Sequence, residues 1–246
     1  MSNNPRDETD LDAQHDNLIQ RHARGEHRWP AAAAVLVVLA SYALLPTVIM
    51  PVTVRVVVVT LGIVMLIPVI ALNPVRLVKE TSWSRTLSVG LALVLAIANV
   101  AALIFVVAVL VTSRSQDGPS MLLAATQVWL TNMIAFALVY WELDRGGPVT
   151  RHTSDRSQLP PADFRFPQDE DHDAIDEVRA RSSAVIGWMP SFVDYLYESA
   201  IGSMAFSQGT AMPLSPRVKM LLLVQSLGAF IMLALVIAHA VGQLGS

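Results

Sequence analysis

The chain has no cysteine among its 246 residues. This excludes a disulfide framework, a thiolate metal site and a cysteine nucleophile. Charged residues are also scarce, at 15%, whereas apolar residues make up 53%. We find no glycine-rich phosphate loop, serine nucleophile elbow or His-Glu-x-x-His pattern, and no soluble domain that would hold a catalytic site. We therefore expect a protein that is not an enzyme, that needs no cofactor or metal and that binds no nucleic acid.

The apolar residues are concentrated in five blocks, each about as long as the ~20 residues that a helix needs to cross a bilayer. None alternates with the period of a barrel strand, so helices are the expected spanning elements. A polar stretch precedes the first block, which makes it unlike a cleaved signal peptide. The sequence predicts an all-α multi-pass membrane protein whose spans are approximately Trp29–Ile49, Val54–Leu72, Leu87–Val111, Met121–Trp141 and Met220–Val241.

Arginine and lysine predict the orientation, because short cytoplasmic loops carry most of the positive charge. With the N-terminus inside, fifteen of these residues lie on the cytoplasmic side and only Arg55 and Arg114 lie outside. We therefore expect a cytoplasmic N-terminus and an external C-terminus. Arginine outnumbers lysine fifteen to two, which hints at a GC-rich bacterial genome and so at the bacterial inner membrane.

Two polar segments flank the first four spans. Residues 1–28 carry four arginines and six carboxylates and are expected to be a disordered tail, and residues 142–190 form an acidic loop with ten carboxylates and six arginines. His15, His22 and His27 in the tail, and the acidic run 169–173, lack a recurrent ligand spacing, so solvated charge is a better interpretation than metal binding. The remaining organisation is three spans over 29–111, a fourth over 112–141, a half-span with its loop over 191–213 and a last span over 214–246.

The half-span is the most informative feature of the chain. Ser191 and Asp194 form a plausible capping box, and the helix that they begin reaches only about 15 Å before Gly202, half of the hydrocarbon core. Ser215 and Pro216 then restart a helix as a cap and a first-turn proline. A half-helix, a small-residue loop and a full helix predict a re-entrant segment that enters and leaves on one side.

Several motifs resemble those of an uncharacterised family of bacterial multi-pass membrane proteins. They cover roughly residues 85–245, and the family is in turn similar to the pore module of potassium channels. The resemblance implies a channel-like arrangement of helix, pore helix, filter and helix. The matching runs are Trp129-Leu-Thr-Asn132, Tyr140-Trp-Glu-Leu-Asp-Arg-Gly-Gly147, Phe164-Arg-Phe-Pro-Gln168, Asp194-x-x-Tyr197, Met212-Pro-Leu-Ser215 and Gln225-Ser226.

The filter position departs from the potassium-channel pattern. A potassium filter reads Thr-Val-Gly-Tyr-Gly-Asp, whereas Ser203-Met-Ala-Phe-Ser-Gln208 stands here, with Ala205 and Ser207 in place of both glycines. Residues with side chains tolerate the required backbone angles poorly, so a dehydrating potassium filter is not expected. The charge count also places the loop on the cytoplasmic side, whereas potassium channels insert it from outside. The candidate pore and loop residues are Asp194, Glu198, Gly202, Ser203, Met204, Ala205, Phe206, Ser207 and Gln208.

Two alternatives stay open for the polar residues. Asp194 and Glu198 either form a cation-attracting carboxylate ring in an oligomer or face water and headgroups as an ordinary polar surface. The intramembrane polar residues either bond helices together or line a pathway, and helix bonding is the commoner use. Small residues on the Gln225 face of the last span suit either oligomer contact or packing within the chain. The fourth span places Gln127 and Thr131 on one face with Asn132 beside them, and Asn99 in the third span is their expected partner. The intramembrane candidates are Asn99, Gln127, Thr131, Asn132 and Gln225.

Two functions follow from these features. The first is an ion-channel subunit that is non-selective or selects an ion other than potassium, built as a homo-oligomer around the pore-loop-like module. The second is a non-conducting accessory or scaffold subunit of a membrane complex. In both, the lipid bilayer and either further copies or a membrane partner surround the protein.

Overall fold

The computed structural model describes residues 25–47, 49–77, 80–112, 118–204 and 209–244. The described chain is mostly helical, as the sequence predicts, with one two-stranded sheet and an isolated bridge between His27 and Arg76. The long helices are α2 (Trp29–Leu44), α3 (Val52–Leu72), α4 (Ser82–Thr112), α5 (Gly118–Leu143) and α10 (Pro216–Leu244), and a shorter helix, α9 (Phe192–Gly202), precedes the last.

Four helices are long and apolar enough to cross a membrane, which indicates a multi-pass, membrane-embedded protein. They correspond to α3, α4, α5 and α10, and α5 has the largest buried share. Alanines on α4 and α5, such as Ala102, Ala124 and Ala135, are fully buried, so these two helices approach closely at the centre of the bundle. α3 has only three buried residues and lies at the periphery.

The first expected span is shorter in the structure than its apolar block. α2 has 16 residues, about 24 Å of helix, and ends at Leu44. Pro46 explains the early end, because the residue before a proline is driven out of the helical region: Leu45 has ψ 142°. Arg55 then donates to the carbonyls of Ala43 and Met50, at 3.2 and 3.5 Å, and so satisfies main-chain acceptors in this turn.

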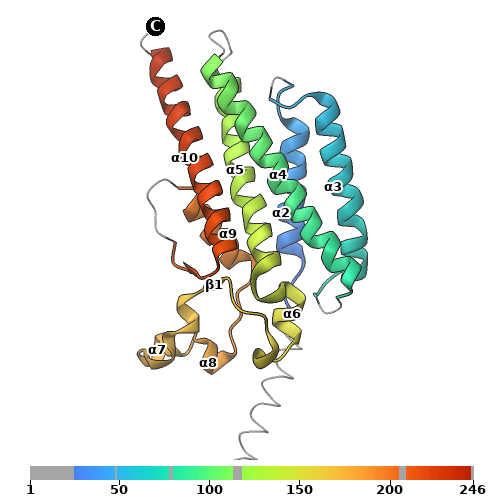
Figure 1. Ribbon diagram of the computed structural model, residues 1–246, viewed down its shortest axis with the longest axis vertical. Helices are drawn as coiled ribbons and strands as arrows, with labels where there is room; N and C mark the ends of the chain where they lie inside the picture. Colours follow the sequence, from blue (N-terminus) through green and yellow to red (C-terminus); the bar gives the residue numbers. More distant parts are fainter. Residues whose placement is uncertain (1–24, 48, 78–79, 113–117, 205–208, 245–246) are drawn as a thin grey trace, which may run out of the picture.

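The five long helices run side by side, and the short elements gather at one end of the bundle (Figure 1). We call this end, formed by residues 25–28, 73–77, 80–85 and 142–191 with the first turns of α9 and α10, the charged end. The ends of α2, α4 and α10 and the starts of α3 and α5 lie at the opposite end. α9 rises from the charged end and packs against α5 and α10 for part of their length.

The segment between α5 and α9 is more ordered than its composition predicts. Its elements are η1 (Asp144–Gly146), α6 (Pro148–Thr153), η2 (Arg156–Gln158), β1 (Phe164–Arg165), η3 (Pro167–Asp169), η4 (Asp171–Asp173), α7 (Asp176–Arg179) and α8 (Ser183–Ile186). β1 pairs antiparallel with β2 (Met212–Pro213), and Leu214 donates its main-chain N–H to Asp163 at 2.8 Å. The segment is thereby fastened to the start of α10.

Candidate functional site

The half-helix α9 begins and ends where its capping residues predict. The Asp194 carboxylate accepts from the Ser191 main-chain N–H at 2.7 Å and from its hydroxyl at 2.8 Å. α9 ends at Gly202, and α10 begins at Pro216, with the Ser215 hydroxyl accepting from the Val218 N–H at 3.3 Å. These local signals need no tertiary contact, which is why the sequence placed both helix starts correctly.

Both carboxylates of α9 have partners within the chain. Asp194 is held by Ser191, and Glu198 is only 4% exposed. The Glu198 carboxylate accepts from the Thr210 main-chain N–H at 3.1 Å and also from the Thr210 hydroxyl. Glu198 thus fastens the returning chain at Thr210 to α9.

The far end of α9 is joined to α5 by hydrogen bonds from small side chains. The Ser199 hydroxyl donates to the Met133 carbonyl at 2.6 Å, and the Trp129 indole N–H donates to the Ser203 carbonyl at 3.2 Å. Ser199 is fully buried and Ser203 is 2% exposed. The small serines let the half-helix approach α5 closely, as polar small residues do between membrane helices.

Gln225 of α10 completes this contact from the other side. Its amide nitrogen donates to the Ser199 carbonyl at 2.8 Å, the Ser199 hydroxyl at 2.7 Å and the Ser203 hydroxyl at 2.8 Å. Its amide oxygen accepts from the Tyr140 hydroxyl at 2.6 Å. One buried side chain therefore joins α10 to both α5 and α9.

Asn99 of α4 is the partner that the sequence predicts for the polar face of α5. Its amide donates to the Asn132 side-chain oxygen at 2.9 Å, and its own oxygen accepts from the Thr131 hydroxyl at 2.8 Å. Asn132 in turn donates to the Ser203 hydroxyl at 3.4 Å, so the two groups of bonds are continuous. We call Asn99, Thr131, Asn132, Tyr140, Ser199, Ser203 and Gln225 the polar network.

Four of the five predicted intramembrane polar residues belong to this network. The exception is Gln127, which is half-buried and contributes its main-chain carbonyl to Thr131 at 3.0 Å. Among the candidate loop residues, Gly202 ends α9, Ser203 joins the network and Met204 is 47% exposed. Ala205, Phe206, Ser207 and Gln208 lie outside the described residues.

The small-residue face of α10 packs within the chain. Gln225, Ala229 and Met232 are each at most 2% exposed. A side chain added at Gly228 would lie 3.0 Å from Leu103 of α4. Of the two interpretations of this face, the contacts favour packing within the chain over contact between copies.

The charged end contains a second buried cluster, which the sequence interpretation missed. The Glu26 carboxylate accepts from the Trp141 indole N–H at 3.0 Å and from the Phe192 main-chain N–H at 2.5 Å, and it lies 3.5 Å from Arg151. Arg151 is fully buried and donates to the carbonyls of Trp141 and Pro190 at 2.7 and 3.0 Å. Glu26 therefore belongs to the folded core, although its position near the terminus suggested a disordered tail.

Asp144 organises the other half of this cluster. Its carboxylate accepts from the Asp163 main-chain N–H at 2.6 Å and from the Tyr195 hydroxyl at 2.5 Å. Next to it, Arg145 has a positive φ of 51° and donates to Asp169 at 2.5 Å. The composition of its segment predicted that Asp169 is exposed to solvent, but Asp169 is the partner of Arg145. The charged residues Glu142, Asp144 and Arg145 directly after the apolar span were a signal of this cluster. The residues that Asp144 and Arg145 bind are distant in sequence, so the sequence did not reveal the pairs.

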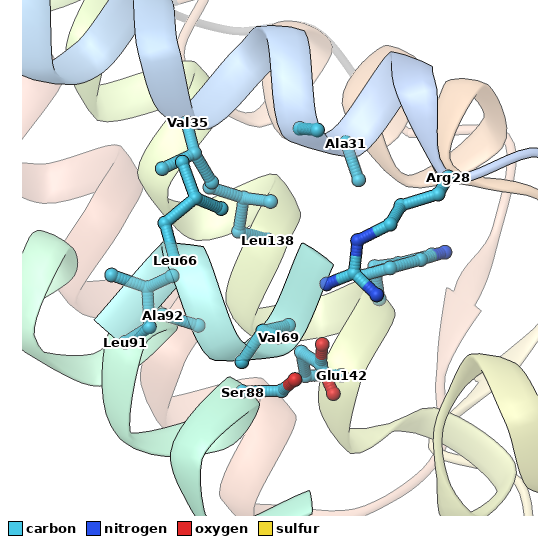
Figure 2. A pocket seen from close by; sticks show the side chains of 12 residues that line it. Arg28, Ala31, Val35, Leu66, Val69, Ser88, Leu91, Ala92, Leu138 and Glu142 are labelled. Atoms are coloured by element: carbon cyan, nitrogen blue, oxygen red, sulfur yellow. The ribbon is translucent and has the colours of Figure 1, made fainter. Parts of the chain in front are cut away.

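A pocket lies beside this cluster, between α2, α3, α4 and α5 (Figure 2). It has a volume of about 30 Å³, with apolar walls at one end and two charged side chains, Arg28 and Glu142, at the other. A second hollow of about 20 Å³ adjoins it and shares five of its lining residues: Arg28, Val69, Ser88, Trp141 and Glu142. Burial lowers the pKa of Arg28, and the negative charge of Glu142 opposes that shift.

Within the part of the chain that the structure describes, no group of three histidine, aspartate or glutamate side chains is placed to hold a metal ion. Comparisons with protein families, with curated proteins and with solved structures find no significant match to this chain.

Proposed function

We propose that this chain is a non-conducting subunit of a membrane complex, acting as an accessory or scaffold protein in a bacterial inner membrane. In this proposal α2 crosses the membrane together with the four longer helices. α9 is a re-entrant half-helix that enters and leaves at the charged end. The charge count favours a cytoplasmic charged end and an external C-terminus.

The observation that carries this proposal is the use of both α9 carboxylates inside the chain. A carboxylate ring that attracts cations needs acceptor oxygens directed to a shared axis. Asp194 instead caps its own helix, and the buried Glu198 binds Thr210. The polar network likewise joins four helices by direct side-chain bonds, which favours helix packing over a water-filled pathway.

An ion-channel subunit is the second candidate, and one arrangement favours it. An 11-residue helix, a loop and a full-length helix follow one another in the order of a pore module. In this candidate the pore module surrounds the axis of a homo-oligomer, and the conducted ion is not a dehydrated potassium ion. The family resemblance remains an expectation in both candidates.

Ion flux into liposomes separates the two candidates. Purified full-length protein is reconstituted, and the uptake of monovalent cations and of anions is compared with uptake by empty vesicles. A non-conducting subunit gives no flux above the empty vesicles. Flux that is altered by Glu198→Gln but not by Glu170→Gln, an exposed carboxylate at the charged end, would instead establish a pore beside α9.

Co-purification and tag accessibility test the rest of the proposal. A scaffold subunit is expected to retain one stoichiometric partner in mild detergent. A tag at the C-terminus is expected to react with an impermeant reagent in intact cells. A tag that reacts only after lysis would reverse the proposed orientation and restore the usual insertion side of a channel pore loop.

A further inference from the structure

A hollow of about 460 Å³ lies between α9, the chain that returns from it and α10. We call it the α9–α10 pocket. Its described lining side chains are apolar apart from Glu198 and Ser226, and Leu223 and Leu227 of α10 form part of its wall. Ligand pockets in proteins usually occupy roughly 300–1,000 Å³ and combine apolar walls with a few polar groups. The α9–α10 pocket has both properties.

Glu198 uses only one of its two carboxylate oxygens for the bond to Thr210. The main-chain N–H and the hydroxyl of Thr210 both donate to Oε1. Oε2 lies beside Gly209, because a side chain added at that glycine would collide with it. Among the residues that the structure describes, none donates a hydrogen bond to Oε2. Glu198 and Gly209 both line the pocket, so this oxygen is available to a ligand there.

The charge of Glu198 also lacks a partner. Two donors on Oε1 favour the ionised carboxylate, which accepts hydrogen bonds and donates none. The side chain is 4% exposed, and within the described ranges no arginine, lysine or histidine forms an ion pair with it. Buried charges are normally paired, because removing them from water is costly. A cation bound in the pocket would supply the missing partner.

The donor set of the pocket suits an organic cation better than a metal ion. Calcium and magnesium take six or more oxygen ligands, and only Glu198 contributes a carboxylate among the described lining residues. An ammonium group needs fewer acceptors and can bind a single carboxylate by a charge-assisted hydrogen bond.

The position of the pocket indicates that such a cation has an apolar body. α10 is one of the four helices long and apolar enough to cross a membrane. Leu223 and Leu227 are 55% and 53% exposed, so this side of α10 faces hydrocarbon when the helix spans a bilayer. Glu198 lies six residues beyond Phe192, about 9 Å along α9 from its start at the charged end. A ligand that reaches the pocket from the bilayer therefore arrives through lipid.

From these observations we infer that the α9–α10 pocket binds a lipophilic amine, a single apolar chain that ends in a protonated primary amine. The ammonium donates to Glu198 Oε2, and the chain lies against Leu223 and Leu227. An alcohol with the same chain donates one hydrogen bond but carries no charge, and the corresponding carboxylate is repelled by Glu198. The inference does not depend on whether the protein conducts ions.

Three ligands with one chain length test the inference. A scintillation proximity assay measures the binding of radiolabelled dodecylamine, dodecanol and dodecanoate to the full-length protein in mild detergent, each corrected for its partition into protein-free micelles. We expect dodecylamine to bind about tenfold more tightly than dodecanol, and dodecanoate to bind most weakly. Equal affinities for the three ligands would overturn the inference without any variant having to fold.

Replacement of the carboxylate assigns the preference to Glu198. Glu198→Gln retains an acceptor for Thr210 but removes the charge, and it is expected to reduce the preference for the amine over the alcohol by about tenfold. Glu170→Gln, at an exposed ion pair of the charged end, is the matched control and leaves the preference unchanged. A preference that survives Glu198→Gln would overturn the assignment of the ammonium.

A filled pocket provides a test that leaves the charge in place. Leu227→Trp adds bulk at the wall and is expected to weaken the binding of dodecylamine by about tenfold. Leu233→Trp is the matched control, because Leu233 is an exposed leucine of the same helix that lies outside the described lining of the pocket. Equal binding by the two variants would place the amine elsewhere on the protein and overturn the inference.

Discussion

Replacement of Gln225 by leucine tests whether the polar network holds α10 to the rest of the bundle. The two N–H donors of its amide are shared among three acceptors on Ser199 and Ser203, and its oxygen accepts from Tyr140. The two N–H donors and the one accepted bond count as three hydrogen bonds. At about 0.6 kcal/mol each, the value measured between membrane helices, they contribute about 2 kcal/mol. The buried Tyr140 hydroxyl then lacks an acceptor, which costs about 1 kcal/mol more.

We therefore expect Gln225→Leu to lower the free energy of unfolding by about 3 kcal/mol. Equilibrium unfolding of the purified protein in mixed micelles, followed by circular dichroism, measures this difference. Gln127→Leu is the matched control, because Gln127 is half-buried and its side chain makes no hydrogen bond to another helix in the described structure. The control is expected to change the free energy by less than about 0.5 kcal/mol.

A double-mutant cycle isolates the bond between Gln225 and Tyr140. Tyr140→Phe removes the hydroxyl that Gln225→Leu would leave without an acceptor, so the double variant is expected to be about 1 kcal/mol more stable than the sum of the single changes predicts. If the two substitutions are strictly additive, or if Gln225→Leu costs no more than Gln127→Leu, the polar network does not stabilise the bundle and the reasoning is wrong.

Two further substitutions test the charged end. Glu26→Gln leaves the buried Arg151 without a counter-charge and is expected to lower the free energy of unfolding by about 3 kcal/mol. The control Glu170→Gln, at an exposed ion pair, is expected to lower it by less than about 0.5 kcal/mol. Equal effects would show that Glu26 is not part of the core. Gly147→Ala places a side chain at φ +90° against a neighbouring arginine and is expected to lower the melting temperature, at a cost of about 1–3 kcal/mol. Gly202→Ala, whose added carbon meets nothing closer than 3.6 Å, is the control, and a similar loss for both glycines would contradict the strain argument.

Predictions that depended on neighbouring residues agree with the structure. The start of α9 at Ser191 and the start of α10 at Pro216 follow from caps within a few residues of each helix end. The end of α2 is also determined by a neighbouring residue, but the sequence interpretation followed the length of the apolar block and placed the end too late. Pro46 stops the helix at Leu44 although apolar residues continue to Ile49.

Predictions that depended on distant partners fared less well. The sequence correctly paired Asn99 with the polar face of α5, because Asn99 and Asn132 each lie near the middle of a long apolar helix. It did not identify Ser199 and Tyr140 as partners of Gln225, since serine and tyrosine carry no signal of their own inside an apolar pattern. It also assigned Glu26 to a tail and Asp169 to solvent, because charged residues in polar segments are usually exposed.

By itself the sequence determined the helical class, the positions of the long apolar segments and the capped half-helix, because hydropathy and capping act over a few residues. Only the tertiary structure decided how the polar side chains are used. Glu26 reaches Trp141 across 115 residues and Phe192 across 166, and Arg28 and Glu142 line one pocket only when α2 packs beside α5. Such contacts depend on which helix faces meet, and no local spacing in the chain specifies that.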